Sequence, residues 1–139
     1  MATELYINQC IDRILQKNPL YTKDAYRFIY DGVNFAHTKI CQRENSKVRD
    51  VQAPELCSLL AEYIQGELGP MALHLLHEWG IYQTNDFGEI IFFMVEERLL
   101  SASADDNRSD FDNHFDFEDV FVKPFKPSFR DVDVPMIEF

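Results

Sequence analysis

The chain has 139 residues, 46% of them hydrophobic, which is enough for one domain with a real core. It carries 13 basic and 24 acidic side chains, a net charge of −11, and such a surface repels nucleic acids, which are themselves polyanions. No apolar run reaches the roughly 18 residues of a membrane span, and the N-terminus lacks the basic-then-apolar order of a secretory signal. We therefore expect a cytoplasmic protein that binds neither nucleic acid directly nor a membrane.

The first hundred residues are expected to form a mainly α body, a small bundle of four or five helices. Apolar residues at helical spacing over 7–15 predict a first helix, which Asn18-Pro19 ends. Thr22 is a suitable N-cap for a second helix, whose apolar stripe continues to Ile40. The aromatic run 26–30 leaves a strand open as an alternative there.

Two further helices are predicted after the polar segment 42–52, which reads as a loop. Pro54 suits the first turn of the third helix, and Gly66 or Gly69 ends it. A fourth helix follows and ends at Gly80, a residue type that favours helix termination.

The fifth predicted helix is apolar around most of its circumference. Asp86 and Glu89 resemble a capping box at its start, and Phe92 and Phe93 lie outside its main apolar stripe. Such a helix is expected to lie at the centre of the bundle or to be covered by a partner.

Residues 101–139 form a distinct acidic, phenylalanine-rich arm with 4 basic and 10 acidic side chains. Prolines from Pro124 onward favour an extended path, and the aromatic rings require an apolar surface, either on the body or on another protein. We expect the rings of the fifth helix and the arm to bind a partner; they are Phe92, Phe93, Phe111, Phe115, Phe117, Phe121, Phe125 and Phe129.

The reactive side chains favour a catalytic or metal site only as an alternative. If six of these side chains converged in the fold, they could form the active site of an acid–base or metal-assisted hydrolase. The six are Asp31, His37, His74, His77, Asp86 and Glu89. Asp31 and His37 are nearly two helical turns apart. His74 and His77 form His-x-x-His-Glu, not the zinc motif His-Glu-x-x-His, and no third ligand is marked nearby. We therefore predict no catalytic residue, no metal ligand and no cofactor.

Two weaker patterns remain. The acidic segment Asp105–Asp116 spaces oxygen ligands like a calcium loop, but Asp110 stands where the sharp turn needs glycine. The three cysteines, Cys10, Cys41 and Cys57, are scattered and contain no CxxC pair, which is typical of reduced structural thiols.

Several short motifs resemble a family of bacterial proteins of about this length from the planctomycete, verrucomicrobial and chlamydial group. They are Asp31-Gly-Val-Asn-Phe-Ala-His37, Leu68-Gly-Pro-Met-Ala72, Trp79-Gly-Ile81, Thr84-Asn-Asp-Phe-Gly-Glu-Ile90 and the phenylalanines between Ser109 and Phe121. The resemblance covers roughly residues 3–121. It implies a bacterial cytosolic protein; the family has no assigned activity, so no catalytic residue carries over.

The sequence therefore predicts a non-catalytic interaction protein, such as an adaptor, a chaperone-like factor or a regulatory subunit. Its partner would be another protein or a second copy of the chain. A protein with a basic surface would be favoured, because the acidic residues of this chain attract it electrostatically. A small hydrolase and an acidic mimic of nucleic acid remain as alternatives.

Overall fold

The computed structural model describes residues 3–44, 52–102 and 106–125, and within these ranges the chain is helical, with no strand. The mainly α prediction is confirmed, and residues 26–30 are helical. The elements are α1 Glu4–Lys17, α2 Lys23–Glu44, α3 Ala53–Leu68, η1 Gly69–Met71, α4 Ala72–Glu78, α5 Thr84–Glu96, η2 Arg108–Phe111, α6 Phe117–Phe121 and η3 Lys123–Phe125, where η marks a 3-10 helix.

Local capping residues place most helix ends where the sequence predicts them. Asn18 caps the C-terminus of α1, and the Thr22 hydroxyl accepts the N–H of Ala25 at 3.2 Å at the start of α2. Pro54 lies in the first turn of α3, and Gly69, not Gly66, ends that helix. Gly80 follows α4 with a φ of 88°, a conformation that glycine adopts without strain.

Two predicted boundaries need correction. Helix α2 continues to Glu44, inside the segment expected to be a loop. The cap of α5 is formed by Asp86 with Gln83, not with Glu89: the Asp86 carboxylate accepts the N–H groups of Tyr82 at 2.8 Å and Gln83 at 3.2 Å. Asp86 therefore acts as the third residue of the helix and reaches back to the groups before it.

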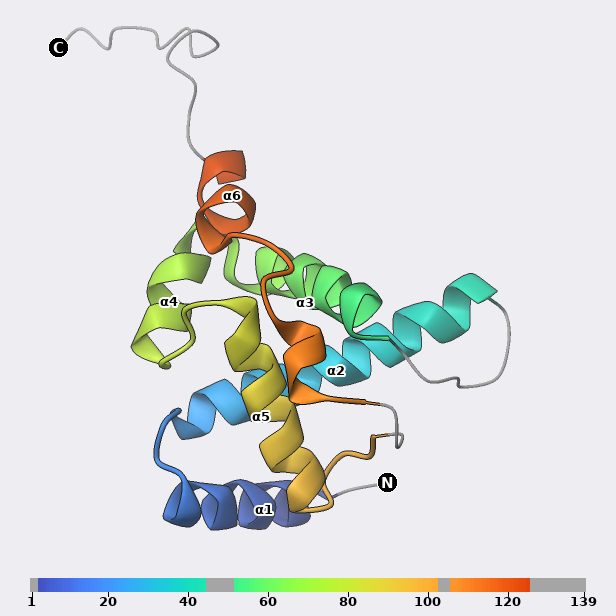
Figure 1. The fold of residues 1–139 in the computed structure, drawn as a ribbon, viewed down its shortest axis with the longest axis vertical. Coiled ribbons are helices and arrows are strands. Elements are labelled where there is room, and N and C mark those ends of the chain that lie inside the picture. The colour runs from blue at the N-terminus through green and yellow to red at the C-terminus, as the bar shows by residue number, and fades with distance from the viewer. Residues whose placement is uncertain (1–2, 45–51, 103–105, 126–139) are drawn as a thin grey trace, which may run out of the picture.

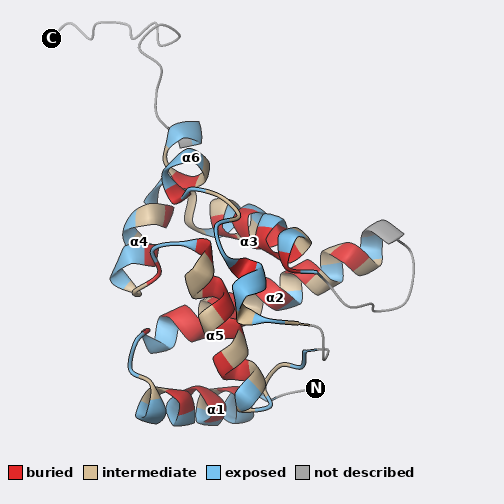
Figure 2. Cartoon of the chain, viewed as in Figure 1, coloured by how far each residue is buried: buried red, intermediate tan, exposed pale blue. Residues whose placement is uncertain are grey.

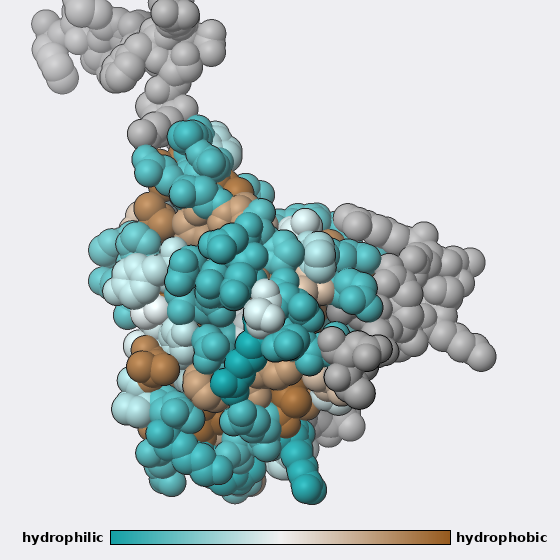
Figure 3. Space-filling view, viewed as in Figure 1, coloured by the Kyte–Doolittle hydropathy of each residue, from teal (hydrophilic) through white to brown (hydrophobic). Residues whose placement is uncertain are grey.

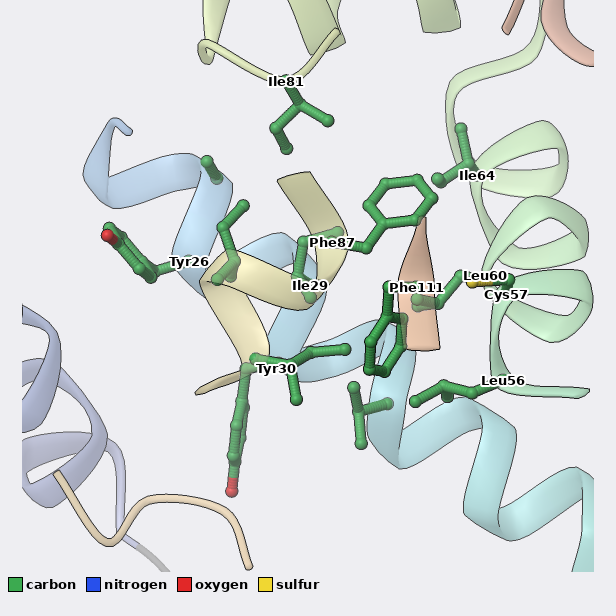
Figure 4. Close-up of a cluster of buried hydrophobic side chains, with 14 of the residues drawn as sticks. Tyr26, Ile29, Tyr30, Leu56, Cys57, Leu60, Ile64, Ile81, Phe87 and Phe111 are labelled. Atoms are coloured by element: carbon green, nitrogen blue, oxygen red, sulfur yellow. The ribbon is translucent and has the colours of Figure 1, made fainter. Parts of the chain in front are cut away.

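Helix α5 lies at the centre of the molecule, as its apolar circumference predicts. It crosses between α1 and α2, and η2 packs along it, while α4 and α6 lie at the opposite end from α1 (Figure 1). The buried surface follows the inner faces of these helices (Figure 2). In the core, Ile29 of α2, Leu60 of α3, Phe87 of α5 and Phe111 of η2 face one another (Figure 4).

The described part of the arm completes this core. Phe111, Phe117 and Phe121 are buried, and the ring of Phe117 stacks on that of Phe87 at 5.5 Å. The Asp116 carboxylate accepts the N–H of Glu118 at 2.8 Å and so starts α6. Residues 108–125 thus form short helical turns, and the extended path expected beyond Pro124 falls on residues outside the described ranges, apart from Phe125 in η3.

Two glycines allow neighbouring segments to approach closely. A Cβ on Gly32 would lie 2.7 Å from Cδ2 of the fully buried Leu60, so the lack of a side chain brings α2 against α3. A Cβ on Gly88 would lie 2.9 Å from the carbonyl oxygen of Arg108 and 2.9 Å from Cβ of Phe111. Gly88 therefore lets η2 pack directly on the backbone of α5, a role that the sequence analysis missed.

Candidate binding groove

A groove of about 820 Å³ lies between α2, the start of α3, the end of α5 and the segment that follows α5. Its volume falls within the range of about 300–1,000 Å³ that is typical of ligand sites. The lining residues come from four separate stretches of the chain; they are Val33, Asn34, His37, Ala53, Leu56, Ile91, Phe92, Val95, Arg98, Leu99, Leu100, Ser101, Ala102, Asp106, Asp110 and Phe111.

The lining combines aliphatic and aromatic side chains with a substantial share of polar groups. Leu56, Ile91 and Phe111 are buried side chains of the core, and the ring of Phe92 meets that of Phe111 edge-on at 6.4 Å. The polar side chains of the lining include the cation Arg98 and the anions Asp106 and Asp110. Asn34 and His37 also belong to them. In the space-filling view, apolar surface is visible where α5 ends, between hydrophilic areas (Figure 3).

One wall of the groove exists because the chain turns sharply after α5. Arg98 adopts a left-handed φ of 61°, and the N–H of Leu99 bonds to the carbonyl of Met94 at 2.9 Å. The N–H of Arg98 bonds to the carbonyl of Val95 at 3.0 Å, which completes a Schellman motif with arginine where glycine is usual. This turn directs Leu99 and Leu100 into the groove lining.

Helix α1 holds this turn in place. Glu97 accepts from Lys17 at 2.7 Å and from Arg13 at 3.1 Å, and these bonds hold the pKa of the Glu97 carboxyl below its usual value. The Tyr6 hydroxyl donates to the Arg98 carbonyl at 3.4 Å. The turn after α5 is therefore attached to α1 through the Glu97 carboxylate and the Arg98 carbonyl, and two helices fix the groove wall.

The opposite wall is attached to α5 by Arg108. Its guanidinium pairs with Glu96 at 2.6 Å and lies over the rings of Phe93 at 5.0 Å and Phe92 at 6.0 Å. Asp110 accepts the N–H of Asn107 at 3.0 Å and so caps η2. The segment 106–111 thus has a defined position next to α5.

The predicted partner-binding rings are divided between the groove and the core. Phe92 and Phe111 line the groove. Phe93, Phe117 and Phe121 are buried in the core, where a partner cannot reach them while the fold is intact.

The remaining rings of that set lie elsewhere. Phe115 is half-buried and contacts the rings of Phe87, Phe117 and Phe121. Phe129 and the side chain of Phe125 lie outside what the structure describes.

The structure does not bring the six alternative acid–base residues into one site. Asp31 pairs with Arg27 at 3.2 Å on α2, and His74 pairs with Glu78 at 3.2 Å on α4. The ring of His77 packs on Tyr82, with centroids 4.9 Å apart.

Of the other three members, Asp86 and Glu89 lie on α5 and His37 lies on α2. Asp86 caps α5 and accepts from the Tyr21 hydroxyl at 2.6 Å, and Glu89 lies 3.8 Å from Arg108. His37 is the member of the set that lines the groove. No group of three or more His, Cys, Asp or Glu in the described ranges is arranged to hold a metal ion.

The cysteines and the acidic segment have structural surroundings. Cys10 and Cys57 are buried and Cys41 is half-buried, and all three thiols are free. Burial raises the pKa of Cys57 to about 12, which disfavours the reactive thiolate. Within the acidic segment Asp110 and Asp116 serve as helix caps, and Asp105 lies outside the described residues.

Comparisons of this chain with protein families, with characterised proteins and with solved structures find no match. The resemblance seen in the sequence motifs therefore stays a prediction. In the part of the chain that the structure covers, no helix has the length and apolar character to cross a membrane.

Proposed function

We propose that this chain is a non-catalytic interaction module that takes a short apolar segment of a partner protein in the groove beside α5. The observation that carries the proposal is the groove itself, with its mixed apolar and polar lining and its volume of about 820 Å³. Apolar side chains leave water when they enter such a site, which is the dominant favourable term in protein association.

The polar groups of the groove suit a peptide more than a purely apolar molecule. Asn34, His37 and Arg98 can donate hydrogen bonds, and Asp106 and Asp110 carry acceptor oxygens. An extended peptide offers N–H and C=O groups to both kinds, while its side chains occupy the apolar part. As part of the same proposal, the sequence resemblance suggests a setting in the bacterial cytoplasm.

A peptide library displayed on phage and selected against the folded chain tests this proposal. We expect enrichment of peptides with closely spaced Leu, Phe or Trp. The substitution Val95→Glu places a charge in the apolar lining and should weaken the selected peptide at least tenfold. Asn34→Phe, at an exposed lining position, should block the same site without adding charge.

The matched control is Leu20→Glu, because Leu20 is an apolar residue that is 66% exposed and does not line the groove. It should leave the affinity within about twofold. The proposal is wrong if no peptide is enriched, or if the enriched peptides bind both groove variants as tightly as the original chain. Turnover of a peptide or ester by the pure protein, lost in His37→Ala, would favour the hydrolase alternative instead.

A further inference from the structure

Four partly buried aromatic rings form a continuous strip across α2, α3 and the end of α4, separate from the groove. The ring of Phe28 lies 5.2 Å from Trp79 and 5.1 Å from Tyr63, and Tyr63 lies 5.2 Å from Phe35. All four rings keep some exposure, and none of them lines the groove. We call this set, Phe28, Phe35, Tyr63 and Trp79, the aromatic strip.

Carboxylates flank the middle of the aromatic strip. Tyr63 and Glu67 lie four residues apart on α3, so their side chains are neighbours on one face of that helix. Burial raises the pKa of Tyr63, and the charges of Asp31 on α2 and of Glu67 raise it further. Arg27 also lies nearby, but its guanidinium is shared between Asp31 and Glu4, the latter at 2.5 and 2.6 Å. Within the described ranges, Glu67 forms no ion pair with a lysine or arginine.

The chain twice places its own cation on a ring beside a carboxylate. The Lys39 ammonium lies 5.4 Å from the centroid of Phe35, at one end of the strip, and pairs with Glu62 at 2.7 Å. Arg108 lies over Phe93 and pairs with Glu96 in the same manner. Tyr63 and Glu67 offer the same combination of ring and carboxylate, yet no cation of the described chain lies over Tyr63.

We propose that the aromatic strip is a second interaction surface, which takes an arginine side chain of a partner protein against Tyr63 and Glu67. The planar guanidinium stacks on an aromatic face and bonds a carboxylate through two N–H groups at once, which an ammonium cannot do. The net charge of −11 attracts such a partner over a longer range. This surface is independent of the apolar groove.

A short peptide of alternating glycine and arginine, with three arginines and no aromatic residue, is the probe. Trp79 is the single tryptophan of the chain and lies in the strip, with Phe28 between it and Tyr63, so its fluorescence reports changes in the strip. We expect a saturable change with this peptide and none with the same peptide in which neutral citrulline replaces arginine.

Substitutions separate recognition at the strip from general attraction to an acidic protein. Glu67→Gln, at an exposed position, and Tyr63→Leu should each weaken the arginine peptide about three- to tenfold, the range expected for loss of a cation–π contact or an ion pair. Glu118→Gln, exposed on α6, removes the same charge elsewhere and should stay within about twofold. Circular dichroism confirms that each variant is folded.

Three results would overturn the proposal: equal binding of the citrulline peptide, equal weakening by Glu118→Gln and Glu67→Gln, or unchanged affinity in folded Glu67→Gln. The groove substitution Asn34→Phe should not change the affinity for this peptide. An experiment that rejects arginine binding at the aromatic strip therefore leaves the proposal of peptide binding in the groove untouched, and the reverse also holds.

Discussion

Two neighbouring tyrosines in the core differ in how their hydroxyl groups are satisfied. The rings of Tyr21 and Tyr26 meet edge-to-face at 6.0 Å. The Tyr21 hydroxyl donates to Asp86 at 2.6 Å, whereas the fully buried Tyr26 hydroxyl has no hydrogen-bond partner among the described residues. A buried polar group without a partner costs about 1–3 kcal/mol.

The pair Tyr26→Phe and Tyr21→Phe should therefore change stability in opposite directions. Tyr26→Phe removes an unpaired hydroxyl and should raise the free energy of unfolding by about 1 kcal/mol. Tyr21→Phe removes a bond to a charged carboxylate and should lower it by about 1–3 kcal/mol. Urea denaturation measures both, and a loss of stability in Tyr26→Phe would contradict the prediction.

The buried thiol of Cys57 predicts a dependence of stability on pH. Burial raises its pKa from 9.0 to about 12 in the fold. Because the folded pKa is the higher one, the contribution of the neutral thiol is complete below pH 9 and is lost as pH rises toward 12. The stability of the original chain relative to Cys57→Ala should fall over that interval, measured by urea denaturation at several pH values. A difference that stays constant to pH 11 would contradict it.

At the scale of elements, the glycines inside helices have opposite roles. A Cβ at Gly88 would meet the Arg108 carbonyl oxygen and the Phe111 side chain of η2, while a Cβ at Gly66 in α3 would have no neighbour within 4 Å. The first glycine is thus required by packing, and the second only weakens its helix.

Alanine at these two positions tests the distinction. Gly88→Ala should lower the free energy of unfolding by about 1–3 kcal/mol, because the Arg108 carbonyl and Phe111 must shift. Gly66→Ala should raise it by about 0.5–1 kcal/mol through helix propensity. Thermal unfolding followed by circular dichroism measures both, and equal effects would mean that η2 does not pack on α5.

Local signals predicted the helices well because caps and periodicity act over a few residues. Thr22, Pro54 and Gly80 lie at helix ends in the structure, as predicted. The Schellman turn at Arg98 could not be predicted, because an arginine gives no signal for a left-handed conformation.

The groove is a further feature that the sequence did not reveal. Its walls bring residues near 33, 56, 95 and 111 together, and the packing of α2 on α3 and of η2 on α5 sets their separation. The phenylalanines were correctly identified as needing an apolar surface. Most of those that the structure describes find it within their own chain.

At the scale of the whole molecule, the segment 106–125 contributes three buried rings to the core. Phe111, Phe117 and Phe121 bury three rings against α3, α4 and α5. A chain that ends at residue 105 would lack all three buried phenylalanine rings. Each buried phenylalanine contributes about 3–5 kcal/mol, whereas a domain has only about 5–15 kcal/mol in total.

We therefore expect the chain that ends at residue 105 to lack a cooperative thermal transition. The variant Phe121→Ala, which keeps the full length, should unfold cooperatively but be about 3–5 kcal/mol less stable. Differential scanning calorimetry measures both. A sharp transition at an unchanged temperature in the shortened chain would show that the arm is not needed for folding.

The late position of these rings has a consequence for biosynthesis. Helix α5 leaves the ribosome before the residues that cover Gly88 and Phe87 have emerged from it. Until Phe121 has emerged, the nascent chain presents an uncovered hydrophobic helix to the cell, and exposed surface of this kind promotes aggregation. Translation pauses or chaperones that act before that point would affect the yield of this protein more than those that act after it.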